Sequence, residues 1–217
     1  MKIISITPLI FPDVKIIKFG RFNDIRGYFT ETFRKSDFLT NSDISFFKKV
    51  EFVQSNESFS KTNTLRGLHF QWNPYMGKLV RVINGQMIDL ILDIRKGSPT
   101  FGKIVGYEMI CLKYNEDVEW IWVPPGFAHG GIYLTETKIE YLCTVEHNPE
   151  CEAGISPLAK DIDWSLFNTE LKKRFNDVTN SSFLTISGKD QNGMSLDYWD
   201  KKEESKNFTY ELNKSFN

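Results

Sequence analysis

The sequence consists mainly of short strand-like runs that are separated by glycine and proline turns, and it shows little helical periodicity. KLVRVI and QMIDLILDI flank Asn84-Gly85, a pair that tolerates positive φ and therefore predicts a two-residue hairpin. VEWIWV ends at Pro124-Pro125-Gly126, and TKIEYLCTVE ends near Asn148-Pro149. Strands at this spacing predict an all-β sandwich or barrel.

Candidate helices are few and short. The best are RKSDFL near residue 35 and WSLFNTELKKRF from Trp164. The final stretch, DKKEESKNFTYELNKSFN, is polar and highly charged. We therefore expect one domain over residues 1–195, followed by a polar C-terminal tail over residues 196–217 that is ordered only against a partner subunit.

Composition narrows the class of protein. Of the 217 residues, 41% are hydrophobic and 25% are charged, which is ordinary for a globular domain with its own core. A net charge of -1 gives no overall attraction for nucleic acid or an anionic membrane. The first apolar run is broken by Pro8 and Pro12 and resembles no signal peptide, and no apolar stretch is long enough to span a membrane. Three irregularly spaced cysteines form no disulfide framework, so we expect a cytoplasmic protein.

Several polar residues interrupt segments that are otherwise apolar. They are His69, Arg66, Lys78, His129 and Tyr141. In a barrel, alternate residues of a strand point into the lumen, so several of these side chains can converge there. Burying so many donors is costly unless an anionic or hydrogen-bonding ligand fills the space. Because Arg and Lys are the usual phosphate binders, a phosphorylated ligand is the natural candidate.

A structural explanation competes with this interpretation for each residue taken singly. An isolated histidine on an apolar strand is more often a core residue than a functional one. Arg66 and Arg81 are ordinarily solvated or ion-paired, and we expect Asp89 and Asp93 to be structural partners for such cations. The joint occurrence of the five polar residues favours a functional site.

Other chemistries lack their motifs. A metal-binding barrel commonly uses an HxH pair, but His69, His129 and His147 are the only histidines and none is two residues from another. There is also no glycine-rich phosphate loop, no GxSxG turn and no cysteine with a partner pattern. Acid–base chemistry without a metal or other cofactor remains. A base, an acid, an enolate clamp and a diphosphate clamp together describe proton transfer next to a carbonyl.

At these residues the chain resembles the dTDP-4-dehydrorhamnose 3,5-epimerase family. The similarity runs from about Asn23 to Asp190 and includes DIRGYFTETF, FVQSNESFS, LRGLHFQ, GKLVRVINGQMIDLILDIRKGSPTFG, PPGFAHG, EYLCT and ISGKD. The resemblance implies a cupin-type double-stranded β-helix, which is a jelly-roll barrel, with a few short helices mainly near the C-terminus. It implies no metal and no redox cofactor, and a substrate that is a nucleotide-diphosphate sugar. It also implies a homodimer in which the N-terminal strand of one subunit completes the site of the other.

The resemblance further implies roles for individual residues. His69 matches the general base, Asp190 the carboxylate that orients it, and Tyr141 the proton donor. Lys78 matches the lysine beside the C4 oxygen of the sugar, where negative charge develops. The residues implied to contact the substrate are Arg66 at the diphosphate, His129, Arg26 and Glu31 near the nucleotide, and Gln54, Asn56, Glu152 and Lys189 along the pocket.

The chain departs from the family pattern at three places. Gly131 follows FAHG where the family usually has an aromatic residue, and we expect this to open space near the sugar. His147 stands where the family places a tyrosine that stacks on the base, so His147 is the expected substitute. The segment GISPLAKDIDW is shorter than usual and lacks its first tryptophan. Alternatives are therefore a C3-only epimerase, an enzyme for a CDP- or GDP-linked sugar, and a catalytically silent cupin that only binds a nucleotide sugar.

Overall fold

The computed structural model describes residues 2–112 and 117–213, and strands dominate this part of the chain. The strands are β1 (Ile3–Pro8), β2 (Lys15–Gly20), β3 (Phe22–Asp24), β4 (Gly27–Phe29), β5 (Gln54–Ser60), β6 (Thr64–Gln71), β7 (Lys78–Asp93), β8 (Ile104–Cys111), β9 (Asp117–Val123), β10 (Phe127–Tyr133), β11 (Thr137–Cys143), β12 (Glu152–Gly154) and β13 (Thr185–Ile186). The helices are α1 (Lys35–Thr40), α2 (Thr169–Thr179), α3 (Gly188–Gln191), α4 (Leu196–Lys201) and α5 (Tyr210–Asn213), with the 3-10 segments η1 (Ser42–Lys49), η2 (Pro149–Cys151) and η3 (Glu203–Asn207). The predicted all-β fold with few short helices is confirmed.

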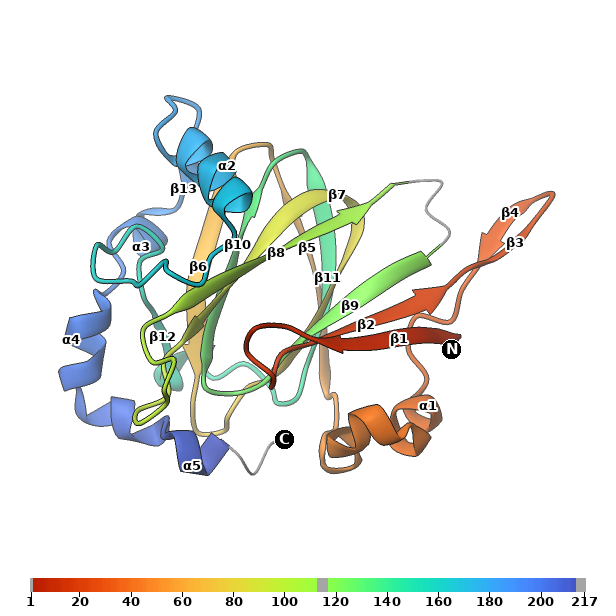
Figure 1. Cartoon of the computed structure of the whole chain (residues 1–217), viewed down its shortest axis with the longest axis horizontal. Coiled ribbons are helices and arrows are strands. Elements are labelled where there is room, and N and C mark those ends of the chain that lie inside the picture. Colours follow the sequence, from red (N-terminus) through yellow and green to blue (C-terminus); the bar gives the residue numbers. More distant parts are fainter. Residues whose placement is uncertain (1, 113–116, 214–217) are drawn as a thin grey trace.

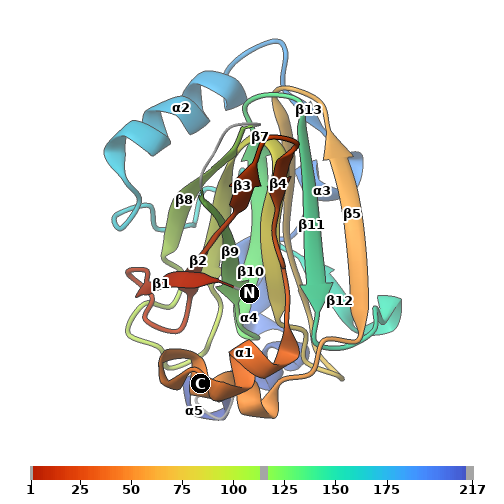
Figure 2. The ribbon, with the colours of Figure 1, turned by 90° about the vertical axis from the view of Figure 1, so that its right-hand side faces the viewer.

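The long strand β7 belongs to both sides of the barrel. Its first half pairs with β9 and β11, and its second half pairs with β8 and β10. One side therefore runs β1-β2-β9-β7-β11-β5, and the other side contains β8, β7, β10, β6 and β12 (Figure 1). Figure 2 shows β5 and β11 side by side at one edge.

The predicted hairpin at Asn84-Gly85 is wrong, because β7 continues through both residues. The pairing of β11 with β7 passes from Lys138↔Asn84 to Ile139↔Val82, so the strand carries a bulge here. Gly85 has φ +102°, and a Cβ on it would lie 2.5 Å from the carbonyl oxygen of Glu136. The dipeptide therefore bends β7 from one side of the barrel to the other, and long-range pairing overrides its local turn preference.

Among the other predicted turns, helices and strand ends, two are confirmed and two differ in their bounds. Pro124-Pro125-Gly126 does turn the chain between β9 and β10, and the helix predicted near residue 35 is α1. The helix predicted from Trp164 begins only at Thr169, after Asn168, whose side chain caps α2 by accepting hydrogen bonds from two backbone amides. Strand β11 ends at Cys143, earlier than the turn at Asn148-Pro149.

Two clusters of buried apolar side chains form the core. The first joins the two sides of the barrel, with Val80 of β7 and Met109 of β8 among its members. The second includes Leu90 of β7, together with Trp199 and Phe208.

The C-terminal segment belongs to that second cluster. Trp199 and Phe208 are fully buried, and their ring centroids lie 4.6 and 5.6 Å from that of Phe70 on β6. The prediction of a tail that needs a partner for its order does not describe residues 196–213, which fold onto the barrel of this one chain. The polar composition did not predict this burial, because Trp199 and Phe208 stand among lysines and glutamates.

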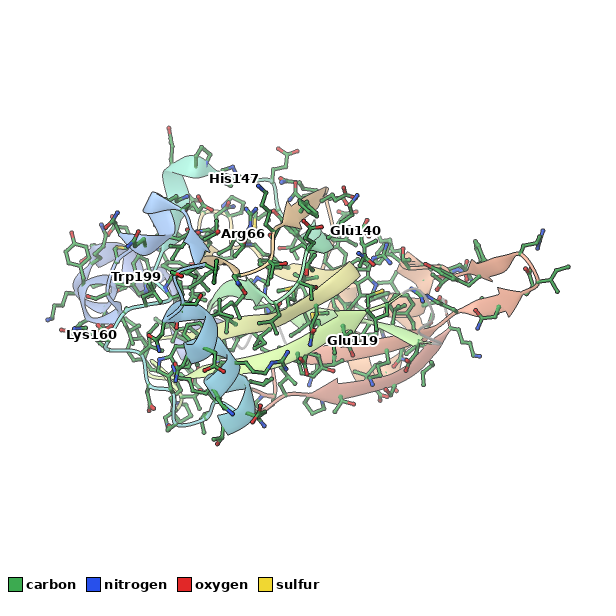
Figure 3. All side chains as sticks on the ribbon, turned by 90° about the horizontal axis from the view of Figure 1, so that it is seen from above. Arg66, Glu119, Glu140, His147, Lys160 and Trp199 are labelled. Carbon is green, nitrogen blue, oxygen red and sulfur yellow. The ribbon has the colours of Figure 1, made fainter. Side chains whose placement is uncertain are left out.

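The hairpin of β3 and β4 projects away from the barrel, on the side opposite α4 (Figures 1 and 3). Its large apolar side chains are exposed, with exposed fractions of 104% for Ile25, 65% for Phe29 and 50% for both Phe22 and Tyr28. Within residues 2–112 and 117–213, no helix combines the length and hydropathy needed to cross a membrane.

Candidate active site

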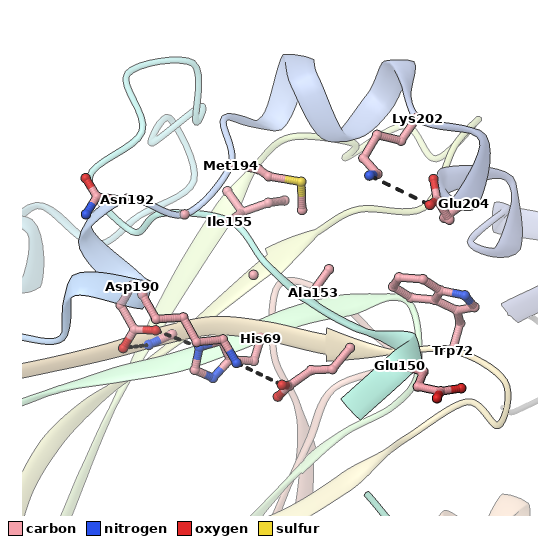
Figure 4. A pocket seen from close by; sticks show the side chains of 15 residues that line it. His69, Trp72, Glu150, Ala153, Ile155, Asp190, Asn192, Met194, Lys202 and Glu204 are labelled. Atoms are coloured by element: carbon pink, nitrogen blue, oxygen red, sulfur yellow. Dashed lines mark hydrogen bonds and ion pairs between the residues drawn. The ribbon is translucent and has the colours of Figure 1, made fainter. Parts of the chain in front are cut away.

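The centre of the site is a hydrogen-bonded pair formed by His69 and Asp190. Nε2 of His69, on β6, lies 2.7 Å from Oδ1 of Asp190, on α3 (Figure 4). Strand β13 pairs in parallel with β6, so the start of α3 lies beside β6. Ser187 caps α3 by accepting a hydrogen bond from the amide of Asp190. The amide of Gly67 donates to Oδ2 of the same carboxylate at 3.3 Å, so both of its oxygens are held.

This pairing fixes which nitrogen of His69 can act as a base. When Nε2 carries its proton toward the carboxylate of Asp190, Nδ1 keeps the lone pair. Burial lowers the pKa of His69 below its ordinary 6.5, and the opposing effect of Asp190 only partly offsets this. A neutral, oriented imidazole is therefore the prevailing form at neutral pH.

Strand pairing brings Lys78 and Tyr141 to the same region. Cys143 of β11 lies opposite Lys78 at the start of β7, and Tyr141 lies two residues earlier on the same face of β11. Burial lowers the pKa of the Lys78 ammonium and raises that of the Tyr141 hydroxyl. Burial thus disfavours the charged form of Lys78, and Tyr141 is a firmly protonated donor.

His69, Lys78 and Tyr141 all line two neighbouring cavities. The first, cavity A, has a volume of about 170 Å³, and the second, cavity B, about 330 Å³. Cavity A also contains Asp190, so the base, its carboxylate, the cation and the hydroxyl share one space. A further groove of about 400 Å³ shares His69 and Asp190 with cavity A and is shown in Figure 4.

Arg66 and His129 complete the polar part of cavity A. His129 lies directly opposite His69 in the pairing of β10 with β6, and its Nε2 is 2.9 Å from both oxygens of the fully buried Asp89. The guanidinium of Arg66 donates to Ser60 Oγ and to a backbone carbonyl, which leaves further donors for a ligand. Asp89 is therefore a structural partner as expected, although it pairs with a histidine and the expectation was an arginine.

Asp93 and Arg81 also behave as expected, but away from the site. Asp93 is fully buried and forms an ion pair of 2.8 Å with Arg95. Arg81 donates from Nε to Glu140 at 2.7 Å and lines neither cavity.

The remaining pocket residues of this chain surround cavity B. They are Gln54, Asn56, His147 and Glu152, while Lys189 lies in the neighbouring groove. Glu152 is 2.9 Å from Nζ of Lys189 and 3.5 Å from Nε2 of His147. Burial acts to raise the pKa of Glu152, but the hydrogen bond from Lys189 and the nearby positive charges outweigh it and lower that pKa. Gln54 holds the His147 segment by accepting from its amide at 2.9 Å.

Two predicted residues are not brought to these cavities. Arg26 lies in the turn of the projecting hairpin, is paired with Asp24 and has a side chain 85% exposed. Glu31, which follows that hairpin, is paired with Arg34. Neither lines cavity A or cavity B.

The prediction that Gly131 opens space in the site is wrong. A Cβ on Gly131 would lie 2.4 Å from Cε of Met87, so the methionine methyl occupies that space. Sequence reasoning overlooked Met87, which lines cavity A together with Val80 and Ile139. Its place two residues before Asp89 on β7 was the available signal, because alternate residues of a strand share a face.

The described residues contain no group of three His, Cys, Asp or Glu side chains that could hold a metal ion. The polar groups present are a carboxylate-oriented imidazole, a phenol, a half-buried lysine and an exposed arginine. These groups can abstract a proton, return a proton and stabilise the charged intermediate between the two transfers.

Comparison with known proteins identifies the family. The profile of the dTDP-4-dehydrorhamnose 3,5-epimerase family matches residues 8–198. The protein of that name from Shigella flexneri is 39% identical over 177 residues, covering 80% of this chain and 92% of the relative. The one from Neisseria gonorrhoeae is 43% identical over 142 residues, covering 65% of this chain but only 40% of that longer relative.

Solved structures agree with this result. The dTDP-6-deoxy-D-glucose-3,5-epimerase of Legionella pneumophila, in complex with dTDP-4-keto-L-rhamnose, superposes with a TM-score of 0.73 at 33% identity, covering 89% of this chain and 93% of that one. The predicted cupin-type barrel is thereby confirmed. The chain belongs to the dTDP-4-dehydrorhamnose 3,5-epimerase family.

Proposed function

We propose that this protein epimerises a nucleotide-diphosphate-linked 4-keto-6-deoxy sugar without a metal or redox cofactor. The observation that carries the proposal is the sharing of one cavity by the His69–Asp190 pair, Lys78 and Tyr141. Simple binding of a nucleotide sugar needs no base paired with a carboxylate and no protonated phenol beside it. The family relationship supports the same reaction class.

The mechanism follows from the acidity of hydrogens next to the C4 ketone. Nδ1 of His69 removes the proton from C3 or C5, and the C–H electron pair moves into an enolate whose oxygen faces the ammonium of Lys78. Tyr141 then returns a proton to the opposite face of the same carbon, and that carbon is inverted. Asp190 stabilises the imidazolium, which persists until His69 releases its proton to solvent and the phenolate of Tyr141 takes one up, so that both residues return to their starting states.

The other polar residues of the two cavities hold the rest of the substrate. Arg66 and His129 supply donors for the diphosphate beside the sugar site. Gln54, Asn56 and the cluster of His147, Glu152 and Lys189 face the nucleotide. Because His147 is smaller and more polar than a tyrosine, a CDP- or GDP-linked sugar remains an alternative to the dTDP form.

Solvent exchange tests the reaction class. In D2O, the enzyme should incorporate deuterium into dTDP-4-keto-6-deoxyglucose, and NMR assigns the label to C3, C5 or both. Label at both carbons with inversion supports a 3,5-epimerase, and label at C3 alone supports the C3-only alternative. No label with the dTDP-, CDP- and GDP-linked forms, despite binding, would establish a silent binding protein.

The pH dependence of kcat/KM should reflect the shifted groups. His69 must be neutral, and its pKa is below 6.5, so activity should be lost only as the pH falls below 6.5. At alkaline pH, activity should be lost when Lys78 loses its charge, and the pKa of Lys78 is below 10.5. Tyr141 must keep its proton, and its pKa is above 10. An acid limb centred above pH 6.5 in the rate profile of the wild-type enzyme would contradict the assignment of His69 as the base.

We propose a homodimer in which Arg26 and Glu31 reach the site of the partner subunit. The exposed apolar side chains of the β3–β4 hairpin and the distance of Arg26 from the cavities of its own chain support this arrangement. A second copy would cover the hairpin and gain the missing contacts. The three free thiols, Cys111, Cys143 and Cys151, support a reducing cytoplasmic location.

Mixing two inactive variants tests the shared site. Arg26→Ala and His69→Ala proteins are unfolded together and refolded, so that subunits assort at random. In a strand-exchanged dimer, about one quarter of all sites then combine an intact Arg26 with an intact His69, and activity should reappear. Matched samples that are refolded separately and then combined provide the control. Failure of the co-refolded sample to exceed that control would place Arg26 outside the partner's site.

A further inference from the structure

Met87 and Gly131 form an interlocked pair in the wall of cavity A. Met87 is 1% exposed, and its terminal methyl fills the position where a side chain on Gly131 would begin. A Cβ on Gly131 would meet Met87 Cε at 2.4 Å, whereas its contacts with the Ile88 carbonyl oxygen and the Tyr133 ring, at 3.5 and 3.8 Å, are ordinary. The flexible thioether of Met87 therefore forms the wall of cavity A beside Gly131.

The wall of cavity A is divided by chemistry. His69, Lys78, Arg66 and His129 supply its polar part, while Val80, Met87 and Ile139 supply an apolar part in which no side chain is more than 6% exposed. A 4-keto-6-deoxyhexose is similarly divided. Its ring positions carry oxygens, and its only apolar substituent is the C6 methyl group.

We infer that Met87, with Val80 and Ile139, receives the C6 methyl of the sugar, and that Gly131 is required because Met87 occupies its side-chain space. The inference rests on the proposed function. It makes Met87 the residue that selects a 6-deoxy sugar over its 6-hydroxy counterpart. An apolar wall rejects an added hydroxyl only moderately, by about 10- to 100-fold.

A substrate pair measures this selectivity. The ratio of kcat/KM for dTDP-4-keto-6-deoxyglucose to that for dTDP-4-ketoglucose should be about 10 to 100 in the wild-type enzyme. Met87→Gln keeps the length of the side chain but offers hydrogen bonds, and it should lower the ratio by about tenfold. Met87→Leu should preserve it. Met109→Gln is the matched control, because Met109 lies opposite Met87 on β8, is equally buried and does not line the cavity.

The outcomes separate the inference from the proposed function. If the wild-type enzyme turns over neither sugar in the dTDP-, CDP- or GDP-linked form, the proposed function fails. If it turns over the 6-deoxy sugar but shows no preference, or if Met87→Gln leaves the preference unchanged, the inference fails while the function stands.

A double-mutant cycle tests the interlock and does not depend on the folding of the glutamine variant. Gly131→Ala should force the Met87 methyl toward the sugar and lower kcat/KM for the 6-deoxy substrate by about tenfold. In a Met87→Ala background the clash is gone, so the same Gly131→Ala change should alter kcat/KM by less than about twofold. Equal effects of Gly131→Ala in both backgrounds would show that Met87 does not occupy that space, and would overturn the inference.

Discussion

Replacement of His69 with alanine should abolish deuterium exchange at both C3 and C5 of the ketosugar. The imidazole of His69 is oriented by the carboxylate of Asp190, burial lowers its pKa, and alanine leaves no base in its place. Loss of a general base costs roughly 10²–10⁴-fold in rate, and more when no other group can reach the proton. The measurement is the initial rate of label incorporation, followed by NMR in D2O with dTDP-4-keto-6-deoxyglucose.

Binding of dTDP distinguishes this effect from damage to the fold. The diphosphate ligands proposed here, Arg66 and His129, are untouched in His69→Ala, so its affinity for dTDP by calorimetry should stay near that of the wild-type protein. His129→Ala is the matched comparison, because His129 lies opposite His69 in the same cavity. It should weaken dTDP binding and leave measurable exchange at saturation. Exchange near the wild-type rate in His69→Ala would remove His69 from the mechanism.

The fold was predictable to the extent that it follows local patterns. Alternation of apolar and polar residues indicated strands, and Pro124-Pro125-Gly126 ended one of them as expected. Asn84-Gly85 is a pair typical of hairpin turns, yet β7 continues through it as one bent strand. Four neighbouring strands bond to β7 along its length, and that pairing outweighs the preference of two residues.

The C-terminal segment illustrates a second limit. Trp199 and Phe208 stand among lysines and glutamates, so no window of sequence around them is apolar. Their burial depends on Phe70 and Trp72, which lie more than a hundred residues earlier in the chain. A pattern read along the chain registers composition, whereas burial depends on which distant residues a side chain meets.

The site divides in the same way. The polar members, such as His69, Lys78 and Tyr141, stood out because charged and titratable residues are unusual in apolar strands. Met87 was overlooked because an apolar residue in a strand is unremarkable until the register places it against Gly131. Residues that carry the chemistry were therefore visible in the sequence, while the residue that shapes the cavity required the pairing of strands.

Replacement of Tyr141 with phenylalanine should separate exchange from inversion. The ring and its packing remain, but the proton proposed for the opposite face of the sugar is lost. His69 can still remove a proton and return a solvent-derived one to the face it came from, so deuterium wash-in should persist. Net inversion should fall by roughly 10²–10⁴-fold.

Tyr133→Phe is the matched control for this experiment. Tyr133 also lines cavity A and is 3% exposed, so the same atom is removed from the same space. Burial raises the pKa of both phenols, and neither ionises near neutral pH, so a difference between the variants reflects position rather than protonation state. The two products, the inverted sugar and the labelled but uninverted sugar, are resolved by NMR in one reaction. If Tyr141→Phe inverts the sugar at the rate of Tyr133→Phe, the returning proton comes from another group, and the two-sided mechanism with Tyr141 as its acid is wrong.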